Sequence, residues 1–149
     1  MSTRAKILVA VAALGVLAFF LVRGGEPTAH VRSLEADPMA TYVPPGGTLV
    51  DTDSRNEGSA PGEPVLARYT RLFQLTRRGS EGAVKDARAR AKASGWTQVR
   101  RADARVFLAD KRAPSGRMEL NITLFEDSLL LPHDVKPPAL LISLRRTGP

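Results

Sequence analysis

Arginine is the residue type in this sequence with the clearest chemical potential, because several arginines occur as adjacent pairs. A guanidinium group presents a planar fork of donors that matches the oxygens of phosphate and carboxylate groups. The pairs predict contacts to an anionic polymer of the cell envelope or to lipid headgroups, and a solvated arginine-rich surface is the alternative. Nucleic acid is disfavoured as the partner, since no aromatic side chains interleave with these arginines. The candidate contacts are Arg77, Arg78, Arg100, Arg101, Arg145 and Arg146.

Residues that commonly hold metal ions are sparse. The sequence has no cysteine, and its two histidines, His30 and His133, lack the His-x-x-His or Glu-x-x-His spacing of metal sites. Asp51 and Asp53 begin like a calcium-binding loop, but Arg55 stands where another oxygen ligand belongs. We therefore expect no metal site and read both histidines as surface residues.

The sequence also lacks the patterns of common catalytic sites. Ser80 lies outside a Gly-x-Ser-x-Gly elbow, and the two glycines at 46 and 47 precede no Lys-Ser/Thr pair. We expect a non-enzymatic protein that needs no cofactor. A small enzyme stays open as a further hypothesis, which would require acids such as Glu119 or Asp110 to converge in a pocket.

An apolar segment near the N-terminus predicts a membrane anchor. Sixteen apolar residues, Ile7 to Val22, lie between Lys6 and Arg23 and would span about 24 Å as a helix, against a hydrocarbon core of about 30 Å. Snorkelling of the flanking basic side chains can cover the difference. We favour an uncleaved signal anchor over residues 1–23; a cleaved signal with secretion and a buried N-terminal helix stay open.

Charge on the two sides of the apolar segment predicts its orientation. Arg4, Lys6 and the amino terminus outweigh Arg23, which an acidic stretch follows. Basic residues are retained on the cytoplasmic side of a membrane span, so the N-terminus should be cytoplasmic and the rest of the chain extracytoplasmic.

The remainder divides by charge into two parts. Residues 24–64 hold two arginines and seven acidic residues, whereas residues 65–149 hold 17 basic and eight acidic residues in a chain of formal charge +7. We expect an acidic Pro/Gly-rich tether over 24–64 and a small basic domain over 65–149. Residues 51–64 are rich in turn formers and predict a loop or disorder.

Within the tether, the run DPMATYVPPGGTLV allows three interpretations. It is a simple tether, a docking segment for a partner, or a stretch, 38–50, that packs on the domain. Packing is favoured because several of its side chains are too apolar for a spacer in water. These side chains are Met39, Tyr42, Val43, Leu49 and Val50.

The basic domain begins with a strand and a helix. Alternating apolar residues over 65–75 predict a strand, which Arg71 interrupts, so a bulge or edge position is expected there. Ser80 is a candidate N-cap for a helix over 81–94, and Gly95 is a natural stop. The narrow apolar face of this helix, Val84, Ala87 and Ala91, should lie close on a sheet, with Trp96 at the junction.

Four further strands are expected, over 97–101, 104–111, 117–126 and 139–146. Met118, Leu120, Ile122 and Leu124 should face the core, as should Leu140, Ile142 and Leu144. The order β-α-β-β-β-β predicts an α+β fold, a two-layer sandwich of one helix on a mostly antiparallel sheet, following the N-terminal transmembrane helix.

Several of these features occur together in one known group of proteins. The apolar anchor, the stretch PMATYVPPGG, the helix that ends in SGW and the hairpins resemble small membrane-anchored or exported proteins of unknown function from high-GC Gram-positive bacteria. The resemblance implies no activity or site. We expect a membrane-tethered extracytoplasmic module that acts through protein or envelope contacts, with binding of anionic polymer or lipid as the alternative.

Overall fold

The computed structural model describes residues 26–60, 63–114 and 116–148. The predicted anchor, residues 1–23, lies outside this range. No helix within the described residues is long and apolar enough to cross a membrane.

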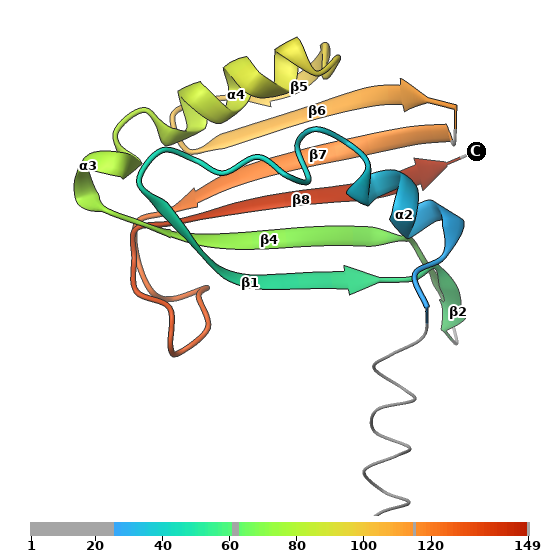
Figure 1. Cartoon of the computed structure of the whole chain (residues 1–149), viewed down its shortest axis with the longest axis horizontal. Helices are drawn as coiled ribbons and strands as arrows, with labels where there is room; N and C mark the ends of the chain where they lie inside the picture. The colour runs from blue at the N-terminus through green and yellow to red at the C-terminus, as the bar shows by residue number, and fades with distance from the viewer. Residues whose placement is uncertain (1–25, 61–62, 115, 149) are drawn as a thin grey trace, which may run out of the picture.

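An antiparallel sheet of six strands forms the centre of the fold (Figure 1). The central strands over 116–125 and 139–148 alternate between apolar and polar residues, which suits a sheet that buries one face. A short hairpin, β2 (Gly58–Ala60) with β3 (Glu63–Val65), lies outside the main sheet. In spatial order the sheet contains β1 (Gly47–Arg55), β4 (Arg68–Leu75), β8 (Ala139–Gly148), β7 (Gly116–Phe125), β6 (Val106–Ala113) and β5 (Gln98–Ala102).

Three helices, α2 (Ala29–Glu35), α3 (Arg77–Ser80) and α4 (Ala83–Ala93), accompany the sheet, and α2 and α4 cover one face of it (Figure 1). The α+β class and the antiparallel sheet are therefore confirmed. The predicted order β-α-β-β-β-β was incomplete, because it omitted β1, α2 and the hairpin. It also gave one helix after the predicted anchor, where residues 26–148, apart from the undescribed positions, form three.

The core lies between this sheet face and the helices. The inward residues predicted for β7 and β8 are all buried, and so is the apolar face of α4. Trp96 is fully buried and belongs to the same cluster, as the sequence predicted. Small alanines on α4 allow its backbone to approach the sheet closely, which is why a helix with so narrow an apolar stripe can seal this core.

The start of α4 differs from the expectation. Ser80 ends α3 instead of capping the longer helix, because Gly82 adopts a left-handed conformation (φ 78°) that separates the two helices. Thr76 supplies the cap of α3, its hydroxyl accepting a hydrogen bond from Gly79 N at 2.9 Å. Gly95, with φ 89°, ends α4 as predicted.

Residues 29–35, expected to be part of the tether, form α2 and bury Val31 and Leu34, whereas the favoured packing of the stretch 38–50 is confirmed for two of its residues. Met39 is fully buried and Tyr42 packs on the same core, where burial raises the pKa of the Tyr42 hydroxyl. Val43, Leu49 and Val50, which were also expected to pack, are exposed. The predicted loop over 51–64 is wrong for residues 51–55, which complete β1 by pairing with β4, and for residues 58–60 and 63–64, which belong to the hairpin of β2 and β3.

The two glycines after Pro44 and Pro45 make a close turn into β1. Gly46 has φ 69°, and Gly47 N donates to Pro44 O at 2.9 Å. A Cβ atom at Gly79 would lie 2.9 Å from Pro45 O, so the turn can rest directly on α3. This stretch is therefore a structural turn that starts the edge strand.

Arg71 lies in neither a bulge nor an edge strand. The β4 strand pairs regularly with β8 on one side, and the bulge is on its other neighbour, between Leu49 and Asp51 of β1. The Arg71 side chain points to the helix-covered face, where its Nη1 donates to Ala40 O at 2.9 Å and Tyr42 O at 3.0 Å. An arginine interrupts the apolar pattern here because it binds backbone carbonyls of the packed segment.

Candidate functional site on the open sheet face

The face of the sheet opposite the helices, called here the open face, is the candidate site. No described helix covers it, and the loop of residues 126–138 lies over one end, where Leu131 and Val135 pack against Leu72 and Ala139. The rest of the face presents polar and charged side chains of neighbouring strands. They include Arg68, Thr70, Asp110, Glu119, Asn121, Ser143 and Arg145.

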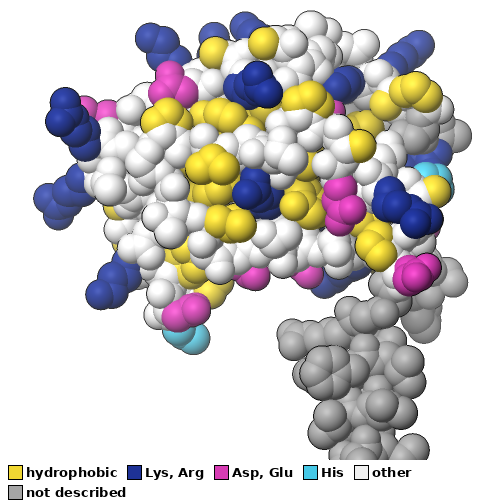
Figure 2. All heavy atoms as spheres, in the orientation of Figure 1, with side chains coloured by type: hydrophobic (Ala, Val, Ile, Leu, Met, Phe, Trp, Pro, Cys, Tyr) yellow, Lys and Arg dark blue, Asp and Glu magenta, His cyan; other side chains and the backbone are white. Residues whose placement is uncertain are grey.

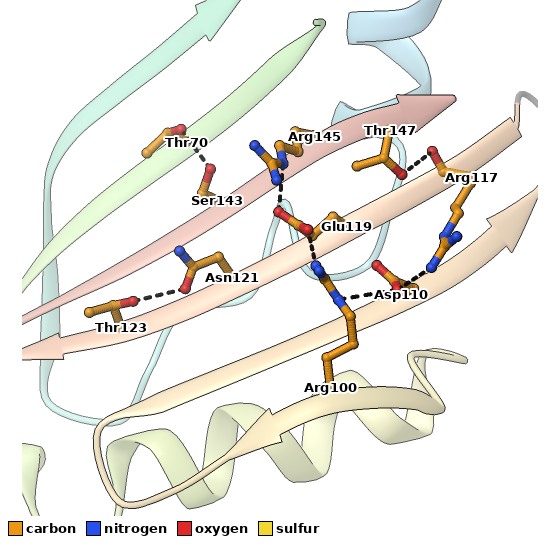
Figure 3. A network of polar contacts seen from close by, with 10 residues as sticks. All are labelled: Thr70, Arg100, Asp110, Arg117, Glu119, Asn121, Thr123, Ser143, Arg145 and Thr147. Atoms are coloured by element: carbon orange, nitrogen blue, oxygen red, sulfur yellow. Dashed lines mark hydrogen bonds and ion pairs between the residues drawn. The ribbon is translucent and has the colours of Figure 1, made fainter. Parts of the chain in front are cut away.

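A network of ion pairs occupies the centre of the open face (Figure 3). Glu119 accepts from Arg100 Nη2 with one oxygen and forms an ion pair with Arg145 Nε, at 2.5 Å, with the other. Asp110 Oδ2 accepts from Arg117 Nη2 at 2.6 Å and forms an ion pair with Arg100 Nε at 3.2 Å. Asp110 is 3% exposed and Glu119 7%, so the arginines shield both carboxylates from water.

The acids named by the enzyme hypothesis thus lie side by side, since Asp110 and Glu119 are register partners on β6 and β7. Glu119 lines a shallow hollow of about 410 Å³. Each carboxylate, however, is held by two arginines, and this arrangement provides a cross-strand clamp. Arg100 reaches both acids because a bulge lies between Val99 and Arg101 of β5.

The six arginines predicted as one contact surface do not assemble. Arg100 and Arg145 meet around Glu119 on the open face. Arg101 pairs with Asp103, whose pKa is lowered chiefly by the Arg105 backbone N–H and then by Arg101. Arg146 follows Arg145 in β8, so its side chain starts from the opposite face.

Arg77 and Arg78 lie far from the others. They form the start of α3, after the C-terminal end of β4, whereas Arg145 pairs near the N-terminal end of that strand. Both are exposed. Figure 2 shows basic side chains projecting at the α3 end and along α4, on the helix-covered side of the molecule.

A different set of arginines does come together on the open face. Arg55, Arg68 and Arg145 are direct register partners across β1, β4 and β8, and we call them the arginine row. All three line one hollow of about 220 Å³ together with Val65 and Leu66. The row continues across the sheet into Glu119 and Asp110.

The arginine row has fewer acidic partners than guanidinium groups. Arg145 is paired with Glu119, while Arg68 Nη2 lies 3.7 Å from Asp53. Arg55 makes no ion pair within the described part of the chain, and Arg68 Nε is buried there without a hydrogen-bond partner. Like charges on directly opposed residues repel, so the row carries an electrostatic cost in the absence of a bound anion.

Sequence reasoning named Arg145 but missed Arg55 and Arg68. Neither belongs to an arginine pair, and Arg55 lies in a stretch that was expected to be a loop. The row exists only because two strand registers align three distant residues. Alternation in β4 could have placed Arg68 on the polar face, but nothing in the sequence fixes the pairing of β1.

A third hollow, of about 210 Å³, lies under the loop of residues 126–138. Its floor is apolar, with Leu72, Phe125 and Leu141, while Asp51 and Asp53 of β1 form one wall. The two aspartates thus belong to a strand and not to a calcium loop. The described residues contain no group of three or more His, Asp or Glu side chains suited to a metal ion.

The histidines have separate positions. His30 Nδ1 lies 2.7 Å from Glu57 Oε1 in a partly exposed pair, and His133 is exposed in the loop of residues 126–138. A hydrogen bond from the Thr28 hydroxyl is the main cause that lowers the pKa of Glu57. These contacts attach the start of α2 to the end of β1.

Comparison with family models, with curated proteins and with solved structures finds no match to this chain.

Proposed function

We propose that this protein is a membrane-tethered extracytoplasmic module that acts by binding rather than by catalysis. The observation that carries the proposal is the open face: a small α+β domain covers one side of its sheet with helices and presents the other side to solvent. A face that is charged, hollowed and uncovered suits contact with a partner or a surface.

The tether is argued from the sequence. The apolar segment Ile7–Val22 has the length and flanking charges of a signal anchor, and its charge asymmetry directs the following chain out of the cytoplasm. The described domain begins only four residues after Val22, so this anchor would hold it at the membrane surface.

Binding is favoured over catalysis by the state of the buried acids. Asp110 and Glu119 are the carboxylates most enclosed on the open face, and each is engaged by two arginines. A general acid or base must reach the proton it transfers, and these oxygens are instead directed into the sheet-spanning clamp.

Membrane fractionation tests the tether. The full chain, expressed in a bacterium, should remain in the membrane pellet after alkaline carbonate washing, with the mass of the uncleaved chain. A variant lacking residues 1–25 should be soluble. A full chain that appears in the soluble or culture fraction with a shortened N-terminus would instead establish the secreted alternative.

A further inference from the structure

We propose that the arginine row binds phosphate groups of anionic phospholipids in the membrane that anchors the chain. This inference rests on the proposed function, because it requires the anchor. It names a ligand and a site: the headgroup phosphate of a lipid such as phosphatidylglycerol, received by Arg55, Arg68 and Arg145.

Charge on this part of the open face favours an anion. The arginine row and the adjoining network contain five guanidinium groups, from Arg55, Arg68, Arg100, Arg117 and Arg145. The carboxylates paired with them come from Asp53, Asp110 and Glu119. The surface therefore keeps an excess of two positive charges, one at Arg55 and one among the three arginines that share Asp110 and Glu119.

The unsatisfied donors favour a ligand with several oxygens. Arg55 has no ion pair within the described residues, and Arg68 has a buried Nε that donates to nothing there. Glu119 offers its two oxygens to Arg100 and Arg145 and is fully used. The two non-bridging oxygens of a phosphodiester can accept from the guanidinium groups of two arginines at once, as the carboxylate of Glu119 contacts two arginines in the adjoining network.

The position of the anchor favours phosphate in the membrane. Glu26 O accepts a hydrogen bond from Asn56 Nδ2 at 3.2 Å, so the described chain begins beside the residue that follows Arg55. Only four residue steps separate Val22 from Glu26, a reach of at most about 14 Å. An anchor that ends at Val22 thus places this end of the sheet at the level of the headgroups.

The arrangement of the strands agrees with this orientation. The end of β1, the start of β4 and the end of β8 lie together at the end of the sheet near the start of α2 (Figure 1). The loop of residues 126–138 and α3 lie at the other end. Leu66, 42% exposed and part of the same hollow, adds an apolar contact beside the arginines.

Acidic residues near the row do not cancel its charge. Glu57 is two positions after Arg55, but its carboxylate contacts the Thr28 hydroxyl and His30 and, among the residues described, forms no ion pair with Arg55. Asp53 is 3.7 Å from Arg68, a long ion pair that leaves the guanidinium open to a second anion.

The test uses the full chain in vesicles and exploits the absence of cysteine. A single cysteine at Leu66→Cys carries a fluorophore, and a lipid with a quencher on its headgroup reports the approach of the domain. Leu129→Cys, at the far end, is the matched position. Vesicles contain phosphatidylcholine alone or with 30% phosphatidylglycerol added, as a chosen test composition.

We expect phosphatidylglycerol to increase quenching at position 66 and not at 129, and high salt to reverse it. The double variant Arg55→Gln/Arg68→Gln should weaken docking by about fivefold per arginine. Arg77→Gln/Arg78→Gln removes the same charge at the far end and should change nothing. Arg145 is kept, because Glu119 depends on it.

Three results overturn the inference. Lipid binding is rejected if the chain floats with the vesicles but quenching at position 66 changes neither with phosphatidylglycerol nor in the double variant. That result leaves the proposed function intact. Displacement by millimolar glycerol phosphate without any effect of phosphatidylglycerol assigns the row to a soluble phosphoester instead. A chain that does not float with the vesicles contradicts the anchor, and with it both proposals.

Discussion

Asp37 Oδ1 accepts a hydrogen bond from Trp96 Nε1 at 3.2 Å, although the two residues are 59 positions apart. The same carboxylate accepts from Met39 N at 2.9 Å and, through Oδ2, from Lys111 Nζ at 2.8 Å. Lys111 also donates to Ser94 O at 2.7 Å, the residue after the end of α4. One buried acid thus connects the segment after α2, the end of α4 and β6.

Replacement of Asp37 by asparagine should destabilise the fold by about 2 kcal/mol, because it leaves a partly buried lysine without its counter-ion. Urea unfolding of the full chain in detergent, followed by the fluorescence of Trp96, measures this. Adding Lys111→Met should recover most of the loss. The control Glu81→Gln, at an exposed position, should leave the free energy of unfolding unchanged. If Glu81→Gln destabilised the chain as much as Asp37→Asn, the role of the Asp37–Lys111 pair would be contradicted.

Met39 should contribute far more to the stability of the fold than its apolar neighbour Val43. Met39→Ala removes a fully buried side chain and should cost about 2–5 kcal/mol, whereas Val43→Ala, at a position 53% exposed, should cost less than about 0.5 kcal/mol. The same urea unfolding compares them. Equal stability of the two variants would show that residues 38–50 do not pack on the domain in solution.

Substitution of two arginines of β4 by glutamine should change the stability of the fold in opposite directions. Arg71→Gln removes two charge-assisted hydrogen bonds to Ala40 O and Tyr42 O and should cost about 2 kcal/mol. Arg68→Gln relieves repulsion within the arginine row and should stabilise the chain by about 0.5 kcal/mol. Unfolding midpoints in the absence of anionic lipid decide this. If Arg68→Gln lowered the free energy of unfolding as much as Arg71→Gln, the arginine row would be a structural feature and not a binding site.

The contact between α2 and β1 should depend on pH through Glu57. Its pKa is below the usual 4.5 in the folded protein, so its stabilising effect is complete above pH 4.5 and is lost as the pH falls below it. In a His30→Gln background, Glu57→Gln should lower stability by a constant amount from pH 7 to about pH 5.5. The difference should then shrink toward pH 3, and a difference that grows in acid would contradict this.

The fold could be predicted from the sequence where the apolar pattern is strong. The positions of the four C-terminal strands and α4 were predicted, and so were the inward faces of α4, β7 and β8, whose apolar patterns their burial explains. The β5 strand is exposed at every position and has no buried face to predict. The β1 strand reads Asp51-Thr52-Asp53-Ser54-Arg55 at its end, entirely polar and exposed, because an edge strand can be held by backbone pairing alone. A polar edge strand and a polar loop look alike in one sequence.

The candidate site was predicted less well, for a related reason. Adjacent arginines in a strand point to opposite faces, so pairs such as Arg145 and Arg146 cannot act on one surface. Arginines that do share a surface are register partners from three strands, and register depends on contacts that no local pattern shows. Arg71 shows the same limit: its apparent break in the strand pattern reflects carbonyl acceptors more than 28 residues away.

The central claim is that the open face lies outside the cytoplasm on a tethered domain. The most direct measurement is labelling of Leu129→Cys, 88% exposed, with a membrane-impermeant maleimide in intact cells. We predict labelling of the membrane-bound chain before lysis, at the same extent as after lysis. Labelling only after lysis would place the domain in the cytoplasm and contradict the account.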